Sequence, residues 1–163
     1  MTSQPETMST TRSTVLRTST HDFCTALISP PPPADLLSTY FTSNPQITEH
    51  GPSWSTTRLP FLHKTFDGTD GCVEYFTLLS DTLEMCLPAD AFPERAGFVV
   101  DAEAEAGKGM VSVVGKGRFT SKKTGKAWDE QFIYRFSGFD AAGKIGWWEI
   151  WADPLSAWEA VGE

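Results

Sequence analysis

Residues Trp128–Trp158 read WDEQFIYRFSGFDAAGKIGWWEIWADPLSAW, and they are the part of the chain that is most informative about its fold. Its first part, residues 128–136, alternates between two sets of positions, as a strand with one buried face does. The more aromatic face consists of Trp128, Glu130, Phe132, Tyr134 and Phe136. A turn at Asp140–Lys144 leads into a second apolar strand, Ile145–Ala152. The stretch therefore predicts an antiparallel hairpin that carries an aromatic face.

Four acids stand inside these aromatic runs, although a strand does not need them in order to fold. They are Asp129, Glu130, Glu149 and Asp153. A carboxyl group in an apolar wall has a raised pKa, because desolvation disfavours its charged form. Such a group is a candidate for proton-transfer chemistry.

The segments before the hairpin combine helices with further strands. We expect a disordered tail at residues 1–18 and a single folded domain at residues 19–163. The predicted helices are residues 21–28, with Thr20 or Asp22 as N-cap, residues 34–41, and residues 71–85, with Asp70 as N-cap. The predicted strands are residues 44–50, 95–104 and 110–120, and residues 154 onward begin a short C-terminal helix.

This order of elements, helices followed by a run of antiparallel strands, is typical of an α+β domain. A long antiparallel sheet with helices on one face tends to curl around them. We therefore predict a cone-shaped, curved antiparallel sheet that wraps around the N-terminal helices and has a mouth at one end.

Composition and motifs exclude several classes of function. The 163 residues carry 21 acids against 13 Lys and Arg, a net charge of −8, so nucleic acid and anionic membranes are not expected partners. No run approaches the ~20 apolar residues of a membrane span, and we expect a cytoplasmic protein. The three cysteines are widely spaced, which predicts packed, reduced thiols without disulfides. Because the three histidines form no ligand pair and no phosphate-binding motif occurs, we expect neither metal nor cofactor.

Two motifs resemble those of the nuclear-transport-factor-2-like superfamily, in particular its SnoaL-like, polyketide-cyclase branch. They are LPFLHKTFDGTDGCVEYFTLL in the middle of the chain and GKIGWWEIWADP in the last strand. The matching positions are Pro60, Phe61, Phe66, Gly68, Gly71, Val73, Tyr75, Phe76, Gly143, Lys144, Ile145, Trp151 and Asp153. ITEHGP and EIWADP are also similar to motifs of fungal SnoaL-like proteins of secondary metabolism.

The resemblance covers about residues 20–160, and it implies the cone fold. It does not specify the reaction, since the superfamily holds isomerases, cyclases, dehydratases, hydrolases and non-catalytic binders. Neither the tyrosine-and-base pattern of ketosteroid isomerase nor the histidine pair of scytalone dehydratase has a match here, so neither mechanism is carried over.

Candidate acid–base residues come from the first and last strands. His50 is either a general base or a packed residue at a strand end. Glu49 and His50 point to opposite faces unless the strand bulges, so they do not share one cavity. Glu149 lies between Trp147 and Trp151 on one face of the last strand. If this face lines the cone, Glu149 stays protonated in an aromatic wall. If the face is convex, Glu149 is an exposed or dimer-interface acid paired with Arg or Lys.

Further candidates lie on the hairpin and in the loops. Glu130 and Tyr134 would polarise a substrate oxygen, unless Glu130 pairs with a neighbouring arginine. Asp153, which precedes Pro154, is favoured as a helix N-cap. His63 lies in the loop expected to roof the mouth, where it contacts a ligand or water. The other predicted substrate-binding residues are Trp54, Phe61, Trp128, Phe132, Trp147 and Trp151.

The acids and the aromatic face predict a cofactor-independent acid–base enzyme, and the resemblance implies that it acts on an apolar polyketide or terpenoid intermediate in fungal secondary metabolism. His50 or Glu149 would be its acid or base. The alternative is a non-catalytic ligand-binding or dimerising module whose cone is filled by aromatic side chains. An enclosed pocket with two or more titratable groups would favour the enzyme. Several tryptophans on the exposed sheet face predict a homodimer through the sheet.

Overall fold

The structure is a computed structural model that describes residues 4–162. Over these residues the α-helices are α1 (Gln4–Ile28), α2 (Pro33–Tyr40), α3 (Gly68–Thr82) and α4 (Pro154–Val161). The strands are β1 (Phe41–Glu49), β2 (Thr65–Asp67), β3 (Leu83–Cys86), β4 (Val99–Asp101), β5 (Met110–Ser121), β6 (Ala127–Ser137) and β7 (Ile145–Trp151). Two short 3-10 helices are η1 (Ser53–Thr57) and η2 (Arg95–Gly97).

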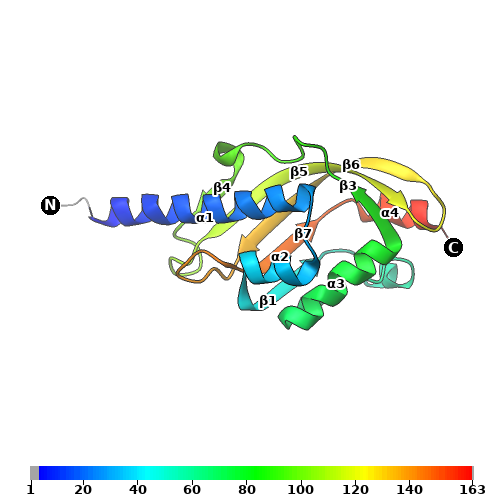
Figure 1. Ribbon diagram of the computed structural model, residues 1–163, viewed down its shortest axis with the longest axis horizontal. Helices are drawn as coiled ribbons and strands as arrows, with labels where there is room; N and C mark the ends of the chain where they lie inside the picture. The colour runs from blue at the N-terminus through cyan, green and yellow to red at the C-terminus, as the bar shows by residue number, and fades with distance from the viewer. Residues whose placement is uncertain (1–3, 163) are drawn as a thin grey trace.

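The strands form one curved, unclosed sheet, and helices α1, α2 and α3 lie across one of its faces (Figure 1). The strand order is β2-β1-β7-β6-β5-β3, with β3 paired to the end of β5 and β4 paired to its beginning. The predicted α+β cone is confirmed. One pairing differs from an all-antiparallel sheet, because β1 and β7 run parallel.

The predicted hairpin is the pair β6 and β7, and it forms the aromatic wall of the core. Its antiparallel register places Tyr134 opposite Ile150 and Phe136 opposite Trp148, and all four of these side chains are buried. Phe23 of α1 packs edge-on against Trp148, with ring centroids 5.0 Å apart. Each such aromatic or aliphatic side chain contributes about 1.5–3 kcal/mol when it leaves water. The hairpin and α1 therefore hold each other in place.

The N-terminal segment differs from the prediction. Residues 4–28 form a single helix, so the predicted tail at residues 1–18 is helical from Gln4 on, and its first three residues lie outside the described part. Contacts distant in sequence explain the helix. Leu16 is fully buried, and the Arg12 guanidinium donates hydrogen bonds to the carbonyl oxygens of Lys108 and Ala141. Thr20 is accordingly no N-cap but lies inside the helix.

Three other boundaries also shift. Helix α3 begins after Asp67, which takes the N-cap position predicted for Asp70. It ends at Thr82, because the next four residues pair with β5 as strand β3. The strand predicted at residues 95–104 shortens to β4, since Asp101 Oδ1 accepts the backbone N–H groups of Glu103 and Ala104 and turns the chain.

None of the described helices is long and apolar enough to cross a membrane. All three cysteines are free thiols. Cys24 and Cys72 are buried as predicted, whereas Cys86 is exposed at the end of β3, the edge strand of the sheet.

Candidate active site

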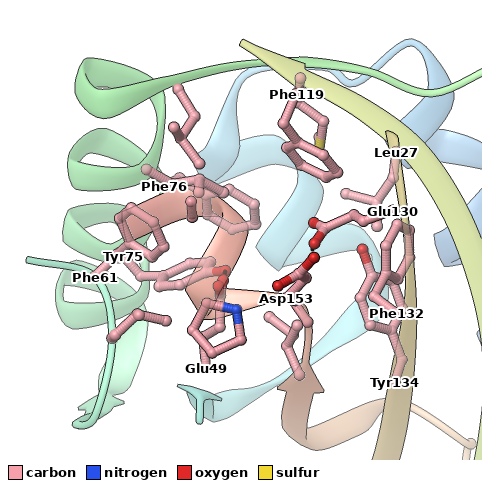
Figure 2. A pocket seen from close by; sticks show the side chains of 18 of the residues that line it. Leu27, Glu49, Phe61, Tyr75, Phe76, Phe119, Glu130, Phe132, Tyr134 and Asp153 are labelled. Carbon is pink, nitrogen blue, oxygen red and sulfur yellow. Dashed lines mark hydrogen bonds between the residues drawn. The ribbon is translucent and has the colours of Figure 1, made fainter. Parts of the chain in front are cut away.

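A cavity lies between α3, the start of α4 and the inner face of the sheet (Figure 2). Its narrow core measures about 40 Å³, inside a wider recess of about 600 Å³ that includes open solvent. The wall is mostly aromatic and aliphatic, yet it carries five side chains that can titrate. They are Glu49, Tyr75, Glu130, Tyr134 and Asp153. The core has room for one or a few water molecules.

Glu49 and Tyr75 form a hydrogen-bonded pair in one wall. The register of β1 with β7 places Glu49 beside Ile150 on the inner face of the sheet. The Tyr75 hydroxyl, from α3, donates a 2.6 Å hydrogen bond to Glu49 Oε1. Burial raises the pKa of Glu49 to about 8; the nearby Glu130 carboxyl adds to this, and the bond from Tyr75 opposes it. Glu49 therefore holds a proton at neutral pH, and Oε2 is the oxygen that can present it.

Glu130 and Asp153 form a second carboxyl pair, and Figure 2 shows their carboxyl groups directed toward each other. The backbone N–H of Asp153 donates to Glu130 Oε2 at 2.9 Å. Burial raises the pKa of Glu130 to about 7, and the neighbouring Asp153 carboxylate also raises it. Glu130 can therefore give or take a proton near neutral pH. No group of three or more His, Cys, Asp or Glu side chains within the described residues is placed to hold a metal ion.

Three further side chains in the wall are hydrogen-bond donors, namely Trp128, Tyr134 and Trp148. Burial raises the pKa of Tyr134 well above its usual range, so its hydroxyl keeps its proton. The Trp148 ring packs edge-on against the Tyr134 ring at 5.0 Å. Its Nε1 is buried and has no hydrogen-bond partner among the described residues. A buried donor without a partner costs about 1–3 kcal/mol, so a ligand oxygen that accepted this hydrogen bond would gain affinity.

Seven of the predicted site residues line this cavity. They are Glu49, Phe61, Trp128, Glu130, Phe132, Tyr134 and Asp153. The prediction that Glu130 and Tyr134 share one face with the aromatic residues of β6 is confirmed. Asp153 also caps α4 as predicted, because its Oδ1 accepts the backbone N–H of Ser156 at 3.0 Å.

His50 and Glu149 lie outside the cavity, and the hypothesis that they face a substrate there is corrected. The face of β7 that carries Trp148 and Ile150 lines the cavity, which leaves Glu149 on the outer face. The Glu149 carboxylate is 3% exposed. It lies 3.1 Å from His50 Nε2 and accepts a 2.9 Å hydrogen bond from Arg135 Nε. The pairing with arginine that was predicted for a convex face is therefore observed, but the carboxyl group is buried within the chain rather than exposed.

Four other predicted site residues also lie elsewhere. Trp54 is 58% exposed and packs edge-on against Trp158 of α4. His63 is exposed, and its Nδ1 lies 2.8 Å from the carbonyl oxygen of Gly51. Trp147 donates from Nε1 to the Thr48 hydroxyl on the outer face. Trp151 stacks on His50 on the same outer face, with ring centroids 4.3 Å apart.

Tyr75 and Trp148 were not among the predicted site residues. Tyr75 follows Cys72 by three positions, and both are buried on α3, so helical spacing counted from Cys72 would have indicated it. Trp148 lies on the opposite strand face from Glu149, and strand parity alone does not say which face is inside.

Solved structures with the same fold exist. An NTF2-like protein from Burkholderia xenovorans superposes with a TM-score of 0.67 at 16% identity, over 91% of this chain and 97% of that one. A candidate polyketide cyclase from Xanthomonas campestris superposes with a TM-score of 0.64 at 12% identity, over 93% of this chain and 99% of that one. A ketosteroid isomerase-like protein from Erwinia carotovora superposes with a TM-score of 0.57 at 15% identity, over 85% of this chain and 94% of that one.

At these identities the likeness shows the fold alone, which is that of NTF2-like proteins. The predicted resemblance is thus confirmed at the level of the fold. No protein-family model and no curated protein matches the sequence.

Proposed function

We propose that this protein is a cofactor-independent acid–base enzyme of the isomerase or cyclase kind. The observation that carries the proposal is a pair of carboxyl groups in one apolar cavity, the buried Glu49 and the partly buried Glu130. Burial raises their pKa values to about 8 and about 7. A proton-transfer group is most efficient when its pKa lies near the working pH, and it then contributes typically ~100- to 10,000-fold.

The two carboxyl groups take complementary roles. Glu130, as carboxylate, removes a proton from the carbon next to a substrate carbonyl, while protonated Glu49 donates its proton to the carbonyl oxygen. The product of these two transfers is a neutral enol. Protonated Glu130 then delivers its proton to a different carbon of the conjugated system, and Glu49 takes back the enol proton, which completes an isomerisation. In a cyclase, the enol carbon instead attacks a second carbonyl group, Glu49 takes back the enol proton, and protonated Glu130 gives its proton to the oxygen of that second carbonyl group.

The remaining polar groups support this chemistry. Tyr75 fixes Glu49 through the 2.6 Å hydrogen bond to Oε1. Tyr134 and Trp148 donate to the same substrate oxygen, and donors placed before the reaction stabilise developing negative charge.

An apolar, carbonyl-bearing substrate fits the wall of this cavity. Aromatic and aliphatic side chains surround the few polar groups, an arrangement that selects a hydrophobic skeleton with one or two oxygens. Polyketides and terpenoids have this character. The kinds of protein among the structural neighbours, a candidate polyketide cyclase and a ketosteroid isomerase-like protein, support the reaction class. The place in fungal secondary metabolism stays a prediction from the motif resemblance.

Hydrogen–deuterium exchange tests the reaction class without knowledge of the natural substrate. The protein is incubated in deuterium oxide with a panel of cyclic enones and 1,3-diketones, and exchange next to the carbonyl is followed by NMR. We expect exchange on at least one compound, and a loss of about 100-fold or more in Glu49→Gln and Glu130→Gln. His50→Ala is the matched control, because His50 lies outside the cavity, and it should exchange at the wild-type rate.

A non-catalytic ligand-binding module is the second candidate. The narrow core of about 40 Å³ favours it, because aromatic rings occupy much of the cone. The exchange assay separates the two functions. If the wild-type protein binds members of the panel and catalyses no exchange, it is a binder. If Glu49→Gln and Glu130→Gln catalyse the hydrogen–deuterium exchange of the test compounds as fast as the wild-type protein does, the assigned acid and base are wrong.

A further inference from the structure

A second hollow, a surface groove of about 530 Å³, lies beside the proline-rich turn between α1 and α2. One side of the groove is formed by Pro30, Pro31, Pro33 and Leu36. Its rim carries the polar residues Thr77, Ser80, Glu84 and Lys122. The groove thus resembles the outer part of a ligand site, with an apolar floor and a polar rim.

The groove and the cavity share part of their walls. Five side chains line both hollows: Leu27, Phe76, Leu79, Leu83 and Met85. They come from the end of α1, from the last two turns of α3 and from β3. A partition about one side chain thick therefore separates the groove from the cavity.

The size of the cavity makes this partition significant. Sites for drug-sized ligands usually enclose about 300–1,000 Å³. The core of the cavity, at about 40 Å³, is too small for such a ligand, whereas the groove has about 530 Å³. A multi-ring substrate reaches Glu49 and Glu130 only if part of the wall moves. Moving the shared wall joins the cavity to the groove.

The shared wall is also the easier part of the cavity to move. Phe76, Leu79 and Met85 are only partly buried, and Met is unbranched and adapts its shape readily. The opposite wall is fixed by backbone contacts. There, Leu62 forms a β-bridge with Glu49, and the His63 N–H donates to the Glu49 carbonyl oxygen at 2.9 Å.

We propose that the groove is the entrance to the cavity and the outer subsite for its apolar ligand, and that Met85 and Leu79 form the gate between them. The proposal deepens the acid–base function and rests on it for the class of ligand. A flat, hydrophobic molecule would lie partly in the groove and extend its carbonyl group past the gate to the carboxyl groups.

Binding kinetics with N-phenyl-1-naphthylamine, a neutral apolar fluorophore, test the gate. Stopped-flow fluorescence gives its association and dissociation rate constants. We expect Met85→Ala to raise both by about tenfold, because a binding step that waits for a conformational change is slowed in both directions. Leu79→Phe should lower both rate constants. The dissociation constant should change much less than either rate constant in both variants.

Glu74→Gln is the control, because Glu74 is exposed on α3 and lines neither the groove nor the cavity, and its rate constants should equal those of the wild-type protein. Circular dichroism checks that each variant is folded. If Met85→Ala does not fold, Leu79→Phe still tests the gate.

The proposed gate is contradicted if the wild-type protein does not bind the fluorophore. It is also contradicted if both variants change the dissociation rate constant and leave the association rate constant unchanged. The readout does not involve proton transfer. A failure of the acid–base function therefore shows in the exchange assay with Glu49→Gln and leaves these rate constants unaffected.

Discussion

Burial raises the pKa of Glu49 from 4.5 to about 8, so between these pH values the folded protein holds a proton that the unfolded chain has released. Stability therefore falls as the pH rises through this window and levels off above pH 8. A shift of this size corresponds to a loss on the order of 5 kcal/mol. We expect Glu49→Gln, which keeps an acceptor for Tyr75, to be about as stable as the wild-type protein at pH 5 and clearly more stable at pH 8.5.

Urea denaturation at the two pH values measures this difference. The raised pKa of Glu130 also makes stability fall with rising pH, up to about pH 7. Part of the pH dependence should therefore persist in Glu49→Gln. Glu74→Gln, an exposed change on α3, is the control and should keep the wild-type profile. Identical profiles for Glu49→Gln and the wild-type protein would show that Glu49 is ionised in the folded state.

For single residues, the sequence predicted which side chains can do chemistry better than it predicted which face of the sheet they occupy. Strand parity correctly separated Glu49 from His50, but the assignment of the inner face depends on what covers the sheet. Helix α1 covers the face with Trp148, through Phe23, and this contact joins residues 125 positions apart in the chain. The inner position of Glu130 was easier to predict, because its strand alternates strictly and one face of that strand is almost wholly aromatic.

Asp153 connects the last strand to α4 and fixes the position of that helix against the cavity. Its carboxylate accepts hydrogen bonds from the Ser156 backbone N–H at 3.0 Å and the Ser156 hydroxyl at 2.5 Å, and Pro154 follows at the first helical position. We expect Asp153→Ala to lower the free energy of unfolding by about 1 kcal/mol, the usual cost of a lost N-cap. Asp153→Asn keeps a capping oxygen and should lose little, as urea denaturation will measure.

Amide exchange locates the effect of the lost cap. Faster exchange in Asp153→Ala should be confined to residues 156–161 of α4. Uniformly faster exchange over the whole domain would contradict a local capping role.

At the element scale, local patterns predicted what local forces determine. The alternation in β6, the turn at Asp140–Lys144 and the cap of α4 all act within a few residues, and all three are as expected. The helical part of the predicted tail and the parallel pairing of β1 with β7 were missed. Both depend on partners far along the chain. In the helix, the polar residues around Arg12 and Leu16 become ordered because these two side chains contact distant parts of the chain.

The whole molecule leaves an apolar strip on the outer face of its sheet. Val114, Ile133 and Trp151 are register partners across β5, β6 and β7. They are 52%, 46% and 38% exposed, respectively. Soluble monomers rarely expose large contiguous apolar patches, and a two-fold axis would let one strip cover an identical one. We therefore propose that two copies of the chain associate through this face.

Light scattering at ~10 µM detects a dimer of micromolar or tighter affinity. We expect the wild-type protein to have about twice the mass of the 17.9 kDa chain. Ile133→Glu places a charge at the centre of the strip and should give a monomer, because a buried unpaired charge is strongly unfavourable. Leu155→Glu is the matched control, since Leu155 is 71% exposed on α4 and lies outside the strip, and this variant should remain dimeric. A monomeric wild-type protein, or a dimer that persists in Ile133→Glu, would show that the strip is not the contact between subunits.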